Sequence, residues 1–135
     1  MNNLRFATSL HILSLLALQD GELLSSEYIA GSININPAVV RKEISNLRDH
    51  GLIESKEGKG GGSTLAKPAG KIWLSDIYNA VRQAPILGRS NEPNPECIIG
   101  RQINKHLQVL YADAEDALVA RLRKTQLSEF IKQFV

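Results

Sequence analysis

Residues 36 to 50 of this 135-residue chain combine basic, polar and small side chains at a helical spacing. Ala38, Arg41, Lys42, Ser45 and Arg48 follow one another at i, i+3, i+4, i+7 and i+10, so a helix places them along one face. Arginine, lysine and serine bind phosphate oxygens and base edges, and a small alanine permits close approach to a groove. This face carries no apolar residue larger than alanine, and it predicts contact of all five residues with DNA.

A glycine-rich stretch follows, in which Gly58 and Gly60 to Gly62 flank Lys59. A P-loop places its lysine after the last glycine, and a dinucleotide fingerprint would need a glycine at position 63, so neither motif is present. The stretch predicts the tip of a β-hairpin, where positive φ angles and close backbone approach favour glycine. We expect this tip to lie along or in the minor groove and to donate to phosphates, although an ordinary surface hairpin would show the same glycines. The expected contacts are Lys56, Lys59, Gly60, Gly61, Gly62, Ser63 and Thr64.

The positive charge of the chain is concentrated around these two stretches. Residues 36 to 71 contain seven basic and four acidic residues, whereas the remainder contains nine basic and ten acidic residues. Such a local excess suits a polyanionic partner, and it is equally typical of a solvated surface.

Two helices are expected before the basic face. Apolar residues at nearly every helical position predict a largely buried helix over residues 4–18, ended by Asp20-Gly21. A short second helix starts at Ser25 or Ser26 and is expected to stop at Gly31-Ser32. Its inward residues are expected to be Tyr28, Ile29 and Ala30.

The basic face itself belongs to a third helix. Asn36 is a good N-cap, Pro37 suits the first helical position, and Gly51 follows as a stop. The pair of short helices therefore predicts a helix-turn-helix, with Ser25, Ser26, Asn36 and Pro37 also near the DNA. The residues expected to face the core are Val40, Ile44 and Leu47.

The segments after this pair predict a winged helix-turn-helix. A strand led by Leu52 and Ile53 and a returning strand over residues 63–67 form the hairpin, or wing. A further short helix is expected to be capped by Ser75, with Trp73 packing beneath the wing. Its inward residues are expected to be Ile77, Ala80 and Val81.

A long helix is expected from Cys97 to Lys124, after a proline-rich loop. Its apolar residues alternate four and three positions apart, which is heptad spacing. Such a seam predicts a homodimer, although the helix could instead fold back on its own domain. A terminal helix over residues 125–135 is expected to be anchored by Phe130 and Phe134.

The predicted organisation is a DNA-binding domain over residues 1–84, a linker over 85–96, and a dimerisation unit over 97–135. The dimerisation residues are Ile103, Leu107, Leu110, Ala114, Ala117 and Leu118.

Several classes of protein are disfavoured. One cysteine excludes an internal disulfide framework, and His11, His50 and His106 show no ligand spacing, so we expect no metal and no cofactor. We find no acid/base pair or nucleophile constellation of an enzyme. The apolar run near residues 10–18 is too short to span a membrane and lacks signal-peptide features, so a cytoplasmic protein is expected.

The sequence resembles the BadM/Rrf-type winged-helix transcription regulators, the family that includes IscR and NsrR. "RFATSLHILSLLAL" and "SSEYIAGSININPAVVRKEISNLRDHGLIES" resemble the family's first helix and helix-turn-helix. "GKGGGSTLAK" resembles its wing, "IWLSDIYNAV" the following helix, and "NPECIIGRQI" its cysteine-bearing region. The resemblance implies a mainly α fold with a small β-hairpin wing, and a homodimeric repressor that binds a palindromic site in double-stranded DNA.

The sequence departs from that pattern at three places. Ser63 stands where tyrosine is common, and Glu57 where a basic residue is common. Cluster-binding members use three cysteines, and here only Cys97 is present, which implies the branch without an iron–sulfur cluster.

Two alternatives remain beside the DNA-binding reading. The same face could bind another protein, although it lacks the large apolar anchors typical of such interfaces. Cys97, expected at the start of the long helix, could be a redox-active thiol, since a helix dipole lowers a thiol pKa, or it could be a buried small hydrophobe.

Overall fold

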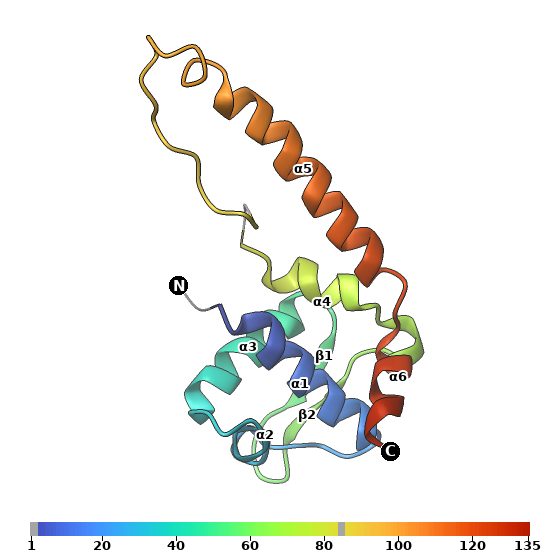
Figure 1. Ribbon diagram of the computed structural model, residues 1–135. Helices are drawn as coiled ribbons and strands as arrows, with labels where there is room; N and C mark the ends of the chain where they lie inside the picture. Colours follow the sequence, from blue (N-terminus) through green and yellow to red (C-terminus); the bar gives the residue numbers. More distant parts are fainter. Residues whose placement is uncertain (1–2, 84–85) are drawn as a thin grey trace.

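The computed structural model describes residues 3–83 and 86–135, which contain six α-helices, one β-hairpin and two short 3-10 helices (Figure 1). The chain begins with α1 (Arg5–Leu18), and α2 (Ser26–Ile33) and α3 (Pro37–Asp49) then form the helix-turn-helix. The wing consists of β1 (Ile53–Lys56) and β2 (Gly62–Leu65), which pair antiparallel with Ile53 opposite Leu65. The 3-10 helix η1 (Ala69–Lys71) leads to α4 (Leu74–Val81), and α5 (Ile103–Leu122) is followed by α6 (Leu127–Phe130) and η2 (Ile131–Phe134).

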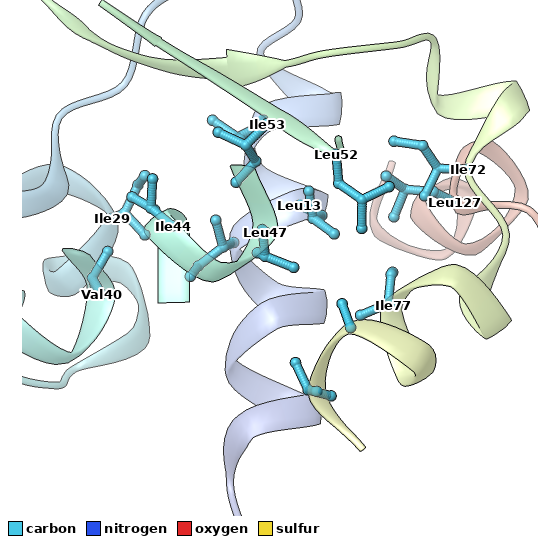
Figure 2. Close-up of a cluster of buried hydrophobic side chains, with 14 of the residues drawn as sticks. Leu13, Ile29, Val40, Ile44, Leu47, Leu52, Ile53, Ile72, Ile77 and Leu127 are labelled. Carbon is cyan, nitrogen blue, oxygen red and sulfur yellow. The ribbon is translucent and has the colours of Figure 1, made fainter. Parts of the chain in front are cut away.

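One apolar core joins the first helices, the wing and the C-terminal helix (Figure 2). Val40, Ile44 and Leu47 from α3 are buried in it, as predicted, and so are the three residues expected from α4. Leu13 from α1 lies in the same cluster as Leu47. The inner face of α3 is therefore fixed in the core, and this packing holds its outer face toward solvent.

The predicted N-caps of α2 and α3 are confirmed. The Ser25 hydroxyl accepts from the backbone N–H of Tyr28 at 3.1 Å, and the Asn36 side chain accepts from that of Ala38 at 2.8 Å. Each cap satisfies a donor at a helix start that would otherwise lack a partner.

The predicted end of α2 is wrong. The helix continues through Gly31 and Ser32 to Ile33, and Asn34 ends it in the left-handed conformation with φ 63°. Asparagine tolerates this conformation better than most residues, so it replaces glycine as the stop. Tyr28 was also expected to face inward, yet it is 51% exposed, and its hydroxyl accepts from Gln19 Nε2 at 2.8 Å.

The start of α4 also differs from the prediction. The helix begins at Leu74, and Ser75 is a buried residue inside its first turn rather than its cap. The Asp76 carboxylate accepts from the backbone N–H of Trp73 at 2.9 Å and so satisfies the helix start. A carboxylate in the first turn is additionally stabilised by the helix dipole. Trp73 is half-buried.

The long helix begins later than predicted, at Ile103 rather than at Cys97. Residues 86–102 are irregular with several turns, and Pro85, the first residue of the predicted linker, lies outside the described residues, as does Ala84. Figure 1 shows α5 extending away from the body of the domain. None of its residues is buried.

The C-terminal segment returns to the domain. The backbone N–H of Leu127 donates to Ile72 at 2.7 Å, and that of Leu74 donates to Thr125 at 2.9 Å. Leu127 is fully buried and anchors the segment. Of the two expected anchors, Phe130 is half-buried and Phe134 is 59% exposed, so the assignment of Phe134 is wrong. No helix in the described ranges is both long and apolar enough to cross a membrane.

Candidate nucleic-acid interface

The outer face of α3 carries the predicted basic and polar side chains together. Ala38, Arg41, Lys42 and Arg48 are exposed, and Ser45 is half-buried at the edge of the same face. Helical periodicity produces this arrangement, because Val40, Ile44 and Leu47 take up the opposite side in the core. The basic and polar side chains on the outer face are therefore accessible to a ligand such as the groove of a DNA duplex.

Sequence reasoning missed one apolar residue beside this face. Val39 is 48% exposed in the first turn of α3. A valine side chain at a groove-facing position can contact a thymine methyl group. The helical period could have predicted this exposure, because Val39 directly precedes Val40 and does not share its inward-facing side.

A hollow of about 440 Å³ lies between the start of α2, the face of α3 and the wing. We call it the α2–wing hollow. It brings together eight of the sixteen residues predicted to contact DNA: Ser25, Ser26, Arg41, Arg48, Lys56, Gly61, Gly62 and Ser63. The other eight lie outside it: Asn36, Pro37, Ala38, Lys42 and Ser45 on α3 or at its start, Lys59 and Gly60 at the exposed wing tip, and half-buried Thr64 in β2.

Two glycines of the wing are required by the protein's own backbone. A Cβ atom on Gly61 would overlap the carbonyl oxygen of Lys56, and one on Gly62 would lie 2.8 Å from that of Leu24. Leu24 pairs with Ser63 through two backbone hydrogen bonds, of 3.0 and 2.9 Å, so the segment before α2 borders the hairpin. The glycines therefore allow close approach within the protein, rather than the close approach to DNA that was predicted.

These contacts correct part of the predicted donor set. The N–H of Gly61 donates to Gly58 at 3.0 Å, and the N–H of Ser63 donates to Leu24. The Ser63 hydroxyl is buried against that of Ser55 at 3.0 Å. Both N–H groups are therefore already satisfied, and the exposed cations and hydroxyls around the hollow are the better candidates for phosphate contact.

The charge around the hollow is mixed. Arg41 lies 3.6 Å from Glu27, which lines the hollow together with Glu57. Both partners of that pair are well exposed, so the attraction is weak in water and Arg41 remains free to rearrange. Within the described ranges, Lys42, Arg48, Lys56 and Lys59 form no salt bridge.

Cys97 is exposed and lies in a turn, six residues before α5 begins. The predicted effect of the helix dipole is therefore wrong. The pKa of the thiol is nevertheless lowered, because the backbone N–H of Gly100, and then that of Ile99, stabilises the thiolate. In the described part of the chain, no three His, Cys, Asp or Glu side chains are placed to share a metal ion.

The predicted seam of α5 is open to solvent. Ile103, Leu110 and Ala117 are exposed, and Leu107, Ala114 and Leu118 are half-buried. At its C-terminal half the helix is held by Arg82, the residue that follows α4, whose guanidinium lies 2.6 Å from the Glu115 carboxylate. Tyr78 also donates to Glu115 at 3.4 Å, and its pKa is raised by burial and by that carboxylate.

Comparisons with known proteins agree with this geometry. A sequence profile of the Rrf2 family, described as "Iron-dependent Transcriptional regulator", matches residues 3–133. The chain is 36% identical to the Bacillus subtilis (strain 168) protein named "Putative HTH-type transcriptional regulator YwnA". The alignment spans 130 residues, which is 96% of each of the two chains. The crystal structure of "a putative DNA binding protein" has a TM-score of 0.75 at 32% identity, over 94% of this chain and 98% of that one. Staphylococcus aureus CymR has a TM-score of 0.70 at 26% identity, over 96% of both chains.

Proposed function

Since the chain belongs to the Rrf2 family and is a DNA-binding transcription regulator, we propose that it acts as a homodimeric repressor of a palindromic operator. In this proposal α3 enters the major groove and the wing lies on the flanking backbone or minor groove. The observation that supports it best is that the basic face of α3, the start of α2 and the wing border one hollow.

The width of a DNA major groove suits insertion of α3. The major groove is about 12 Å wide and admits one α-helix, whose exposed side chains then reach base edges. Arg41, Lys42 and Arg48 would contact bases and phosphates from α3, and Lys56 and Lys59 would contact phosphates from the wing.

A second copy would complete the DNA-binding unit. The seam of α5 leaves large apolar side chains in water, among them Leu110, which is 56% exposed. Pairing of two such helices removes this surface from water and produces twofold symmetry. Two recognition helices then meet half-sites one helical turn apart, about 34 Å.

We further propose that this regulator works without an iron–sulfur cluster, although the family profile is described as iron-dependent. Such clusters are held by about four ligands, most of them cysteine thiolates. The chain has one cysteine, and Cys97 is exposed in a turn. The donor set of this chain therefore does not fit a cluster.

A thiol-based redox response is a second candidate for regulation. It is supported by the exposure of Cys97 and by the two N–H groups that favour its thiolate. Thiolates, rather than thiols, react with oxidants. Oxidant treatment of the protein before DNA binding would test this candidate, with Cys97→Ser as the control.

Selection of bound sites from random duplex DNA, using the purified full-length protein, tests the proposal. The expected result is a palindrome whose half-sites are one helical turn apart, bound with an affinity that falls steeply with salt. In vitro transcription from a template that carries the site at a promoter should be reduced. Recovery of no preferred site, with capture of a protein partner insensitive to nuclease, would favour a protein-interaction module instead.

A further inference from the structure

The inner side of α3 contains a buried carboxylate. Glu43 is only 4% exposed, and it is the sole charged residue that is buried among residues 3–83 and 86–135. It lies in the middle of the recognition helix, next to Lys42 and two residues from Arg41. A charge in this position needs a partner, because removing it from water is costly.

The partners of Glu43 come from the start of α1. Arg5 Nε donates to Glu43 Oε1 at 2.7 Å, and Arg5 Nη2 donates to Oε2 at 3.4 Å. The hydroxyl of fully buried Ser9 donates to Oε2 at 3.3 Å. Three donors on α1 therefore hold one carboxylate on α3. The Arg5 side chain is partly exposed to solvent, whereas the Glu43 side chain is buried.

Stability alone does not require this arrangement. An apolar pair of similar volume is often as stable as a buried ion pair, or more so. The neighbours of Glu43 on the inner side of α3, Val40, Ile44 and Leu47, already supply apolar burial. The ion pair adds a fixed relative orientation of the two helices, because a two-point arginine–carboxylate contact has a preferred geometry that apolar packing lacks.

The orientation of α3 is important because this helix carries the side chains for base contact. A residue that reads a base edge must be held within about 0.5 Å and 10–20° of its productive geometry. Rotation of α3 about its axis would move Arg41 and Lys42 sideways relative to a base pair. A contact that fixes Glu43 limits this rotation.

We propose that Glu43 is a specificity-determining positioning residue. Held by Arg5 and Ser9, it sets the rotation at which α3 presents Arg41 and Lys42 to base edges, and it does so without touching DNA. The inference rests on the proposed function, in which α3 is the recognition helix.

Loss of the contact should change sequence discrimination more than general affinity. Non-specific binding depends on the number of phosphates neutralised, which a small rotation leaves unchanged. Base readout depends on hydrogen-bond geometry, and one misplaced contact lowers discrimination by about tenfold.

The experiment measures binding of the full-length protein to a selected site and to an unrelated duplex, together with thermal stability. Three variants are compared with the wild-type protein. Glu43→Leu removes the acceptor, Glu43→Gln keeps a carbonyl acceptor for Arg5, and Val40→Ala weakens the packing of the same helix without removing a polar contact. We expect Glu43→Leu to reduce the ratio of specific to non-specific affinity by about tenfold, with the same salt slope. Glu43→Gln should reduce the ratio less, and Val40→Ala should leave it unchanged despite lower thermal stability.

The outcomes separate this inference from the function on which it rests. A Glu43→Leu protein that discriminates as well as the wild type would overturn the inference alone. A loss of discrimination that follows thermal stability across the variants, Val40→Ala included, would show a merely structural role and would also overturn it. If the wild-type protein selects no site, the proposed function fails first.

Discussion

At the scale of single residues, the contact between Arg5 and Glu43 joins two helices that are far apart in sequence. Glu43 is buried, whereas the Arg5 side chain keeps 34% of its surface exposed. The two ends of the contact therefore respond differently to truncation. A buried carboxylate without its partner is costly, while a partly exposed guanidinium can be solvated by water.

Arg5→Met should therefore destabilise the protein more than Glu43→Leu. We expect a loss of about 3 kcal/mol in the free energy of unfolding for Arg5→Met, because it leaves the buried carboxylate uncompensated. Glu43→Leu should lie within about 1 kcal/mol of the wild type. Urea denaturation of the two variants checks the order, and the reverse order would contradict the burial assigned to the carboxylate.

Cys97 should react faster than a cysteine in an unfolded peptide. Its pKa is lowered by the N–H groups of Gly100 and Ile99, so a larger fraction is thiolate at any pH below the ordinary value. Alkylation with iodoacetamide, followed from pH 6 to pH 10, should show its midpoint below that of the same protein in urea. A midpoint that does not differ between the folded and unfolded protein would show that the turn has no influence on the thiol.

At the scale of elements, the wing is fixed by glycines that contact backbone rather than ligand. Gly62→Ala brings a Cβ against Leu24, so we expect a loss of about 2 kcal/mol in unfolding free energy from overpacking. Gly31→Ala is the matched control, since Gly31 lies inside α2 with open space around it. It should stabilise the protein by up to about 1 kcal/mol, because alanine favours a helix. Equal effects of the two changes in thermal denaturation would contradict the close approach of the wing to Leu24.

The elements that sequence could predict are those determined by local signals. Asn36 and Pro37 begin α3 as predicted because a cap and the first turn involve adjacent residues. The period of Val40, Ile44 and Leu47 likewise determines which face is exposed, and hence where the basic residues lie.

The features that sequence missed depend on distant partners or on competing local signals. The helical period puts Glu43 on the inner side of α3 with Val40 and Ile44, but the partner that allows a carboxylate to be buried there could not be predicted, because Arg5 lies 38 positions away. Leu127 is an anchor only because the chain returns to Ile72. In α2, Gly31 suggested a stop, but Asn34 supplies the left-handed residue one turn later.

At the scale of the whole molecule, the exposed seam of α5 determines whether the proposed dimer forms. Leu110→Asp places a charge on the seam, which opposes burial of that position against a second copy. We expect this variant to be monomeric by light scattering and to bind a selected palindrome much more weakly. Gln108→Asp, an exposed change on another face of the same helix, should remain dimeric. A Leu110→Asp protein that stays dimeric would place the interface elsewhere.

The central claim, that α3 reads bases while the wing contacts the backbone, is tested most directly by salt-dependent binding of Arg41→Ala and Lys59→Ala. Binding to a selected site and to an unrelated duplex would be measured for both variants and the wild type. Arg41→Ala should lose about 1–3 kcal/mol of discrimination at one base pair. Lys59→Ala should weaken binding to both duplexes alike and reduce the salt slope by about 1. Unchanged affinity, discrimination and salt slope in both variants would contradict the account.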